Sequence, residues 1–252
     1  MLDYLKRIWT GTATKKEHLT YFFSAFGIYL LGIIIAASLY PGEFSMTTVY
    51  ISYLGGYPNN PDGYMFYNIC EIIAGVLFAA HFIFLYKRLV PALKIVAFVA
   101  CVFGIIGSLG FASIGIYYQG SNALGHQITT WLAFGGFGGS ALLLIPVLIR
   151  KMCLKHNWPS VGSFLAAYGV TIGIGVLAVL LENYGDWFIS LGLDPGYTSG
   201  KFTEWLYMFV VIAWLFGTAI IAKDPANVRE IEDEEIEDEE IEDEEIEDEE
   251  IE

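Results

Sequence analysis

Six long apolar segments, separated by short polar ones, constrain the fold of this chain more than any other feature. Each has about the 20 residues that a helix needs to cross the hydrocarbon core of a bilayer. A helix satisfies its backbone N–H and C=O groups within the segment, as that core requires. The sequence therefore predicts an all-α polytopic membrane protein, a bundle of six transmembrane helices. The predicted spans are Tyr21 to Leu39, Met65 to Tyr86, Lys94 to Ile116, Gln127 to Ile149, Ser160 to Leu181, and Phe202 to Ala222.

The basic residues predict the orientation of these spans. Twelve of the 13 Lys and Arg residues fall on one side of the membrane when all six segments are spans, and Lys201 alone falls on the other. Lys and Arg near the ends of spans are retained in the cytoplasm. We therefore expect a multi-pass protein of the cell membrane with both its N-terminus and its C-terminus in the cytoplasm.

The net charge of −15 comes from the C-terminal tail. Residues 230–252 contain 18 acidic residues and no basic one, in repeats of IEDEE. Without them, 13 Lys and Arg face 10 Asp and Glu, a net charge of +3. The isoleucines are five residues apart and form no stripe on a helix, and the acidic side chains repel one another. We therefore predict three parts: a cytoplasmic N-terminal segment (1–20), a six-helix transmembrane domain (21–222), and an acidic cytoplasmic tail (223–252), disordered or in fluctuating helix.

One ionisable side chain lies well inside the second predicted span. Glu71 is six residues past the start of that span at Met65, which places it about 9 Å below the outer boundary at 1.5 Å per residue. Tyr64 and Asn68 share its helix face, because they precede it by seven and three residues. An ionisable group inside a span is costly enough to indicate a functional site by default.

Two more polar side chains are predicted at the depth of the outer boundary. His126 immediately precedes the fourth span, and Glu204 lies in the first turn of the sixth. If these helices are neighbours, both residues converge with Glu71 in one pocket of the outer leaflet. A carboxylate in a first helical turn also stabilises the helix dipole, which explains Glu204 equally well. Tyr64, Asn68, Glu71, His126 and Glu204 are thus the candidate ligand-binding residues.

The first outer loop, from Tyr40 to Tyr64, is long and half apolar. It ends in a cluster of Gly, Pro and Asn residues typical of turns. Two arrangements fit this composition. The loop either lies on the outer surface as a short amphipathic element or folds over the helix bundle as a lid.

Short motifs for metal binding or catalysis are absent. No HExxH, paired-histidine, GxSxG or GxxxxGK[ST] pattern occurs in the chain. We therefore predict no metal site and no cofactor, and we assign no catalytic residue. An enzyme would have to use Glu71 and His126 as general acid or base toward a lipid ester or phosphate.

Several of these segments together resemble a known family. They are Ser52 to Asn68, the glycine-rich third span running into SIGIYYQ, Gly125 with His126, and Glu204. They resemble an uncharacterised six-helix prokaryotic family, domain of unknown function 998, over about Tyr21 to Ala222. This family is distantly similar to the Frag, DRAM and Sfk membrane proteins. The resemblance implies a six-span fold, a polar site on the outer face and, for the eukaryotic relatives, a connection with lipid remodelling or distribution.

Three functions follow as hypotheses. The first is binding of a lipid headgroup in the outer-leaflet pocket. The second is an intramembrane lipid-modifying enzyme, a hydrolase or acyl transferase, that uses Glu71 and His126. The third is a membrane scaffold acting through its acidic tail, which would bind divalent cations or basic partners. Membrane lipids are the expected partners and nucleic acids are not. The oligomeric state is left open by the sequence.

Overall fold

The structure, a computed structural model, describes residues 2–89, 93–155 and 158–221, without the side chains of Arg88, residues 151–167 and Ile221. Every regular element among these residues is a helix, and five described helices are long and apolar enough to cross a membrane. The prediction of an all-α polytopic membrane protein is therefore confirmed. The long helices are α2 (Lys15–Ser38), α4 (Tyr64–Leu89), α5 (Lys94–Ile116), α6 (Ala123–Lys155), α7 (Trp158–Asn183) and α9 (Gly200–Ile221).

Some predictions fall on residues outside this description. The predicted span Ser160 to Leu181 lies within α7, of which the described apolar part, Tyr168–Asn183, is shorter than a full span. The count of six spans, the cytoplasmic orientation and the choice of the cell membrane therefore stay predictions. The acidic tail, residues 223–252, lies outside the described residues.

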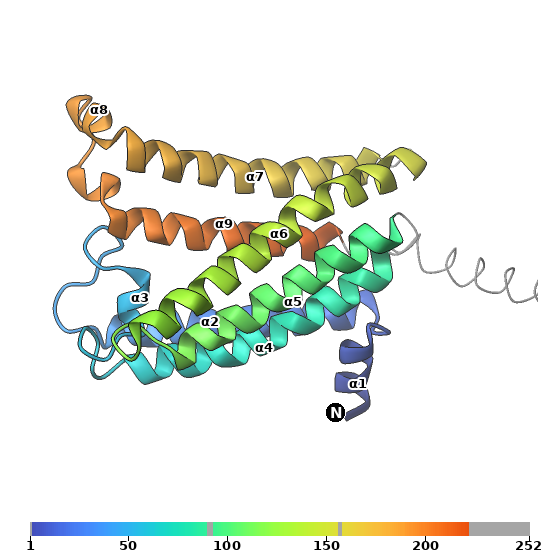
Figure 1. Cartoon of the computed structure of the whole chain (residues 1–252), viewed down its shortest axis with the longest axis horizontal. Helices are drawn as coiled ribbons and strands as arrows, with labels where there is room; N and C mark the ends of the chain where they lie inside the picture. Colours follow the sequence, from blue (N-terminus) through green and yellow to red (C-terminus); the bar gives the residue numbers. More distant parts are fainter. Residues whose placement is uncertain (1, 90–92, 156–157, 222–252) are drawn as a thin grey trace, which may run out of the picture.

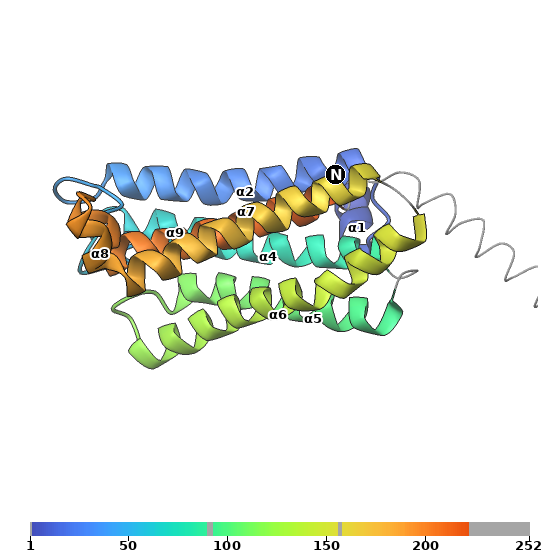
Figure 2. The ribbon, with the colours of Figure 1, turned by 90° about the horizontal axis from the view of Figure 1, so that it is seen from above.

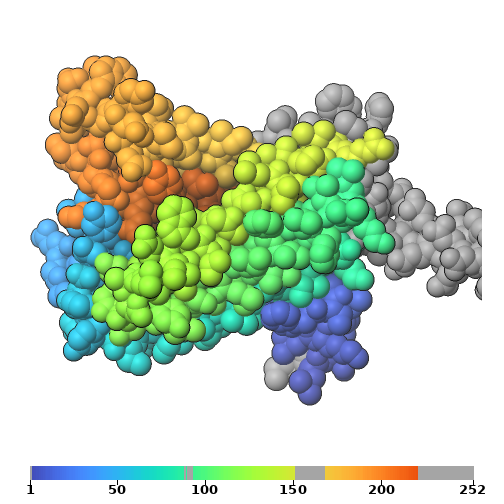
Figure 3. Space-filling model, viewed as in Figure 1, coloured from blue at the N-terminus to red at the C-terminus, as the bar shows by residue number. Residues whose placement is uncertain are grey.

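The long helices run along a common axis (Figures 1 and 2). α4 packs against α2 and α5, α5 packs against α6, and α7 packs mainly against α9. α6 and α7 separate away from their connection, and α9 is visible between them in Figure 3. We call the end of the bundle that carries α3 (Ile51–Leu54) and α8 (Gly185–Ser190) the outer end, following the predicted orientation.

Short helices that the sequence reading missed complete the fold. α1 (Leu2–Thr10) crosses the inner end and buries Ile8 in the core (Figure 1). Arg7 forms a salt bridge with Glu17, which belongs to the capping box that begins α2. The 3-10 helix η1 (Pro195–Thr198) follows α8 in the third outer loop. These elements are too short for hydrophobic periodicity to reveal them.

A chain of polar side chains ties three helices together near the inner end. His18 of α2 and His81 of α4 are hydrogen-bonded at 3.0 Å, and the other ring nitrogen of His81 lies 3.0 Å from the Thr218 hydroxyl of α9. All three side chains are buried, and the His18 ring stacks on Phe84 with centroids 3.8 Å apart. These bonds link α9 to α2 and α4. The α9 backbone itself makes few close contacts with either helix.

α5 and α6 meet at glycines, which lets their backbones touch. A Cβ atom placed on Gly136 of α6 would lie 2.3 Å from the backbone nitrogen of Gly107 on α5. Gly135, its neighbour in α6, has nothing within 4 Å of the same added atom. Of these two adjacent glycines, only Gly136 lies in the close contact between the helices, so only Gly136 is required by the packing.

We expect Gly136→Ala to destabilise the protein by about 1–3 kcal/mol, because the new methyl group forces the α5 and α6 backbones apart. Gly135→Ala is the matched control. It should leave stability unchanged or raise it by up to about 1 kcal/mol, since alanine is the better helix former. Thermal unfolding of both variants in mild detergent measures the difference. Equal unfolding midpoints would contradict the packing described for Gly136.

Candidate functional site

A cavity of about 70 Å³ lies at the outer end, between α4, α5, α6 and α9. Residues of α3 and of the α5–α6 connection also line it, so the outer loops form one of its walls. This volume holds a few water molecules or one small polar group. The polar lining residues are Ser52, Asn68, Glu71, Gln119, His126, Thr130 and Glu204, and the others are Ile51, Gly55, Tyr67, Ile114, Tyr118, Phe134 and Met208.

The structure brings four of the five predicted ligand-binding residues together around this cavity. Asn68 and Glu71 come from α4, His126 from α6 and Glu204 from α9. Tyr64, the fifth, is not among the lining residues. Its ring packs instead against Tyr57 and Tyr118, with centroids 5.2 and 5.4 Å apart. Tyr64 therefore supports the aromatic wall at Tyr118 and does not face the cavity.

Glu71 is the most enclosed of the polar lining residues that carry an ionisable group. Its side chain is 2 % exposed, and its Oε2 atom has no hydrogen-bond partner. It forms no salt bridge within the described part of the chain. Removing a carboxylate from water costs several kcal/mol unless a partner compensates. Glu71 thus lines the cavity with one carboxyl oxygen unsatisfied.

Glu204 approaches the same cavity from α9. Its carboxyl group interacts with the hydroxyl of Ser52 and with the N–H groups of Ile51 and Ser52, while its Oε2 atom accepts no hydrogen bond. The hydrogen-bonded hydroxyls of Tyr29 and Tyr67, 3.1 Å apart, lie within electrostatic range of both Glu71 and Glu204. The two carboxyl groups therefore lie near the same tyrosine pair.

His126 has one ring nitrogen committed to the backbone. Its Nδ1 lies 2.8 Å from the carbonyl oxygen of Tyr117, so this nitrogen must carry the proton and donate. In the neutral ring, Nε2 is then left as an acceptor. Thr130, one turn further along α6, donates its hydroxyl proton to the His126 carbonyl at 2.7 Å. The donors of both side chains are therefore used within the protein.

The first outer loop folds over the end of the bundle as a lid. Its residues Ile51 and Leu54 are 4 % and 0 % exposed. Trp205 of α9 donates its ring N–H to the Val49 carbonyl at 2.9 Å, and Asn68 donates its amide to the Gly55 carbonyl at 2.9 Å. These bonds decide between the two arrangements that the sequence allowed.

Asn60 holds this loop to the end of α2. Its fully buried Nδ2 donates to the carbonyls of Ala36, at 2.9 Å, and Leu54, at 3.0 Å. Its Oδ1 accepts from the N–H of Gly63 at 3.2 Å. One side chain thus satisfies three backbone groups from three segments, which otherwise would be buried without partners.

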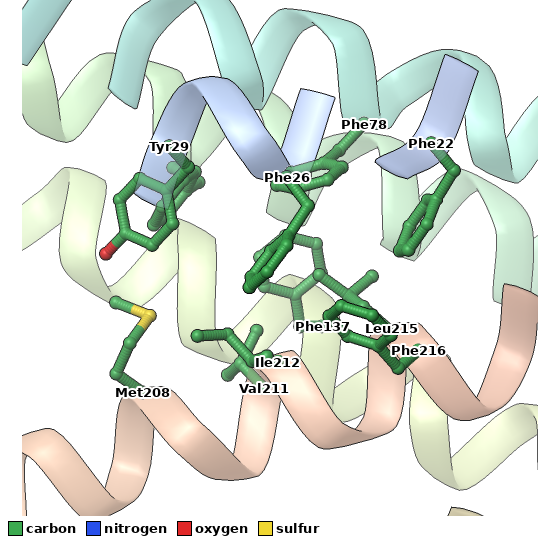
Figure 4. A pocket seen from close by; sticks show the side chains of 11 residues that line it. Phe22, Phe26, Tyr29, Phe78, Phe137, Met208, Val211, Ile212, Leu215 and Phe216 are labelled. Carbon is green, nitrogen blue, oxygen red and sulfur yellow. The ribbon is translucent and has the colours of Figure 1, made fainter. Parts of the chain in front are cut away.

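A second, apolar cavity adjoins the polar one and is shown in Figure 4. Its volume is about 10 Å³, because aromatic side chains of α2, α4, α5 and α6 and apolar ones of α9 fill most of the space. Met208 lines both cavities. Tyr29, the partner of Tyr67, lies at the same end of the apolar cavity as Met208 (Figure 4). The polar cavity and the apolar cavity are therefore separated only by shared wall residues such as Met208.

One known family model matches nearly all of this helical bundle. A family model described as "Protein of unknown function (DUF998)" matches residues 23–221. The chain belongs to the DUF998 family. No curated protein and no solved structure matches it. The predicted family membership is confirmed, and the more distant resemblance to the Frag, DRAM and Sfk proteins stays a prediction.

The DUF998 match contains every residue that lines the polar cavity. His18, at the inner end, precedes its first matched residue. All described residues that line the cavity therefore belong to the matched region.

Sequence reasoning missed several lining residues that helical spacing could have revealed. Tyr67 precedes Glu71 by four residues, and Met208 follows Glu204 by four, so each pair shares a helix face. Ser52, Tyr118 and Gln119 come from loops, whose approach to the bundle no periodicity predicts.

The polar cavity of this DUF998 protein combines ionisable side chains with aromatic rings. Among the described residues, no three His, Cys, Asp or Glu side chains are close enough to share a metal ion. The hydroxyl of Thr130 is hydrogen-bonded to its own helix, so it is not activated by His126 as a nucleophile would be. What the lining offers is a set of hydrogen-bond acceptors beside aromatic rings.

We expect Asn60→Ala to lower the free energy of unfolding by at least about 2 kcal/mol, since each buried polar group left unsatisfied costs about 1–3 kcal/mol. Asn59→Ala is the control, because Asn59 is a neighbouring asparagine that makes none of these bonds. Thermal unfolding followed by tryptophan fluorescence gives the comparison. Similar losses for the two variants would show that Asn60 does not anchor the loop.

Proposed function

We propose that this DUF998 protein binds the headgroup of a membrane lipid in the polar cavity at its outer end. The observation that carries this proposal is the buried carboxyl of Glu71, a residue that lines the cavity and has an oxygen that no described group satisfies. An intramembrane carboxyl kept without a partner indicates a ligand that supplies one. Stability alone would favour an apolar side chain at this position.

The surroundings of the cavity support a lipid as the ligand. Exposed apolar side chains cover the outer half of α6, among them Ile128, Trp131 and Leu132. Phe134 of α6 and Met208 of α9 add apolar walls to the cavity.

Filling the cavity tests this proposal without changing any charge. We expect Thr130→Phe to lower the lipid occupancy of the purified protein about tenfold or more, because a steric penalty of about 1.4 kcal/mol already gives a factor of ten. Ile128→Phe is the control, since Ile128 lies on the same helix and is half exposed. Native mass spectrometry with lipid identification measures the occupancy.

The wild type and Ile128→Phe should retain one lipid class that Thr130→Phe has lost. A wild type without bound lipid, or equal retention by Thr130→Phe, would refute the proposal. The same spectra distinguish binding from catalysis, because an enzyme would convert an added lipid into a product of different mass.

A further inference from the structure

Residues that line the polar cavity carry hydrogen-bond acceptors without a partner. Three buried oxygens have no donor: Oε2 of Glu71, Oε2 of Glu204 and Oδ1 of Asn68. All three residues line the cavity. The amide orientation of Asn68 follows from its bond to the Gly55 carbonyl, which requires Nδ2 as donor. These three oxygens are therefore acceptors available to a ligand.

Several donors around the cavity are already used within the protein. Nδ1 of His126 donates to the Tyr117 carbonyl, and the Thr130 hydroxyl donates to the His126 carbonyl. The hydroxyls of Tyr29 and Tyr67 bond to each other. A ligand that satisfies this site has to bring its own N–H or O–H donors.

The charge of the cavity has a single sign. Glu71 and Glu204 are its acidic lining residues, and no Lys or Arg is among the residues that line it. Aromatic rings of Tyr67, Tyr118 and Phe134 form part of the wall. Carboxylates attract a cation, and ring faces add to that attraction.

We propose that the cavity is a recognition site for a primary ammonium group, carried by the lipid headgroup; this inference rests on the proposed function. A primary ammonium carries three donors and a positive charge, which match the unsatisfied oxygens and the acidic lining of the cavity. A trimethylammonium carries the charge without donors. A bare phosphate or a glycerol headgroup brings no positive charge, and a phosphate would face two carboxylates. A metal ion has no group of three suitable ligands among the described residues.

The experiment compares headgroups on one acyl composition. Purified full-length protein is mixed with equal amounts of phosphatidylethanolamine, phosphatidylcholine and phosphatidylglycerol of identical chains, and bound lipids are counted by native mass spectrometry. We expect phosphatidylethanolamine to be favoured over phosphatidylglycerol about tenfold or more, a difference of about 1.4 kcal/mol. Phosphatidylcholine should lie between them, because it carries the charge alone.

Three single variants test the origin of this preference. Glu71→Gln and Glu204→Gln, on different helices, should each lower the preference for phosphatidylethanolamine at least about threefold, because each removes one of the two charges. Glu43→Gln is the charge-matched control, since Glu43 is an exposed carboxylate of the first outer loop and does not line the cavity. It should leave the preference unchanged. Two independent variants keep the test valid if one of them does not fold.

The outcomes separate this inference from the proposed function. Lipid bound without headgroup preference, and displaced by Thr130→Phe, would refute the ammonium site and leave lipid binding intact. A preference that survives in both glutamate variants would refute it as well. Ethanolamine alone is the last arm. If it raises the unfolding temperature of the wild type, but not of Glu71→Gln, the ammonium site stands and its ligand is the free amine.

Discussion

The polar cavity depends on one constraint, the need of the first outer loop to satisfy the backbone groups that it buries. Asn60 binds carbonyls of Ala36 and Leu54, Asn68 binds that of Gly55, and Trp205 binds that of Val49. The Asn68 side chain can approach Gly55 closely because glycine has no Cβ atom. A Cβ atom at this position would lie 2.4 Å from the Asn68 side chain. Without these bonds a buried loop would carry unpaired polar groups at a cost of about 1–3 kcal/mol each. The loop can therefore be buried as a lid because these side chains replace water as hydrogen-bond partners of its backbone.

The same bonds determine the chemistry of the cavity. Asn68 uses an amide N–H to hold the lid while its Oδ1 stays unsatisfied, and His126 uses its Nδ1 proton on the Tyr117 carbonyl. Two carboxyl groups, each with an unsatisfied oxygen, line the same cavity. A site with this composition is unlike one for phosphate, which requires Arg, Lys or free N–H groups. The inner-end chain of His18, His81 and Thr218 differs because its members satisfy one another.

Much of the fold could be predicted from the sequence. The predicted span Lys94 to Ile116 has the same bounds as α5, and the spans beginning at Met65 and Phe202 agree with α4 and α9 to within a few residues. Apolar length is a local property, which is why it succeeds. α1 and α3 were missed because helices of nine and four residues have no long periodic pattern. Depth alone predicted one level for Asn68, Glu71, His126 and Glu204, which line one cavity. Tyr64, predicted with them, packs its ring against Tyr118 and is not among the lining residues.

The sequence by itself determined the membrane class and the approximate bounds of most long helices, because hydrophobicity and helical rise act along the chain. It also carried the motifs by which the chain belongs to the DUF998 family. Only the tertiary structure decided that the first outer loop is a lid, which helices enclose the cavity and which donors are already used. The physical reason is that these bonds join distant residues, such as Val49 with Trp205, whose pairing exists only once the helices have packed.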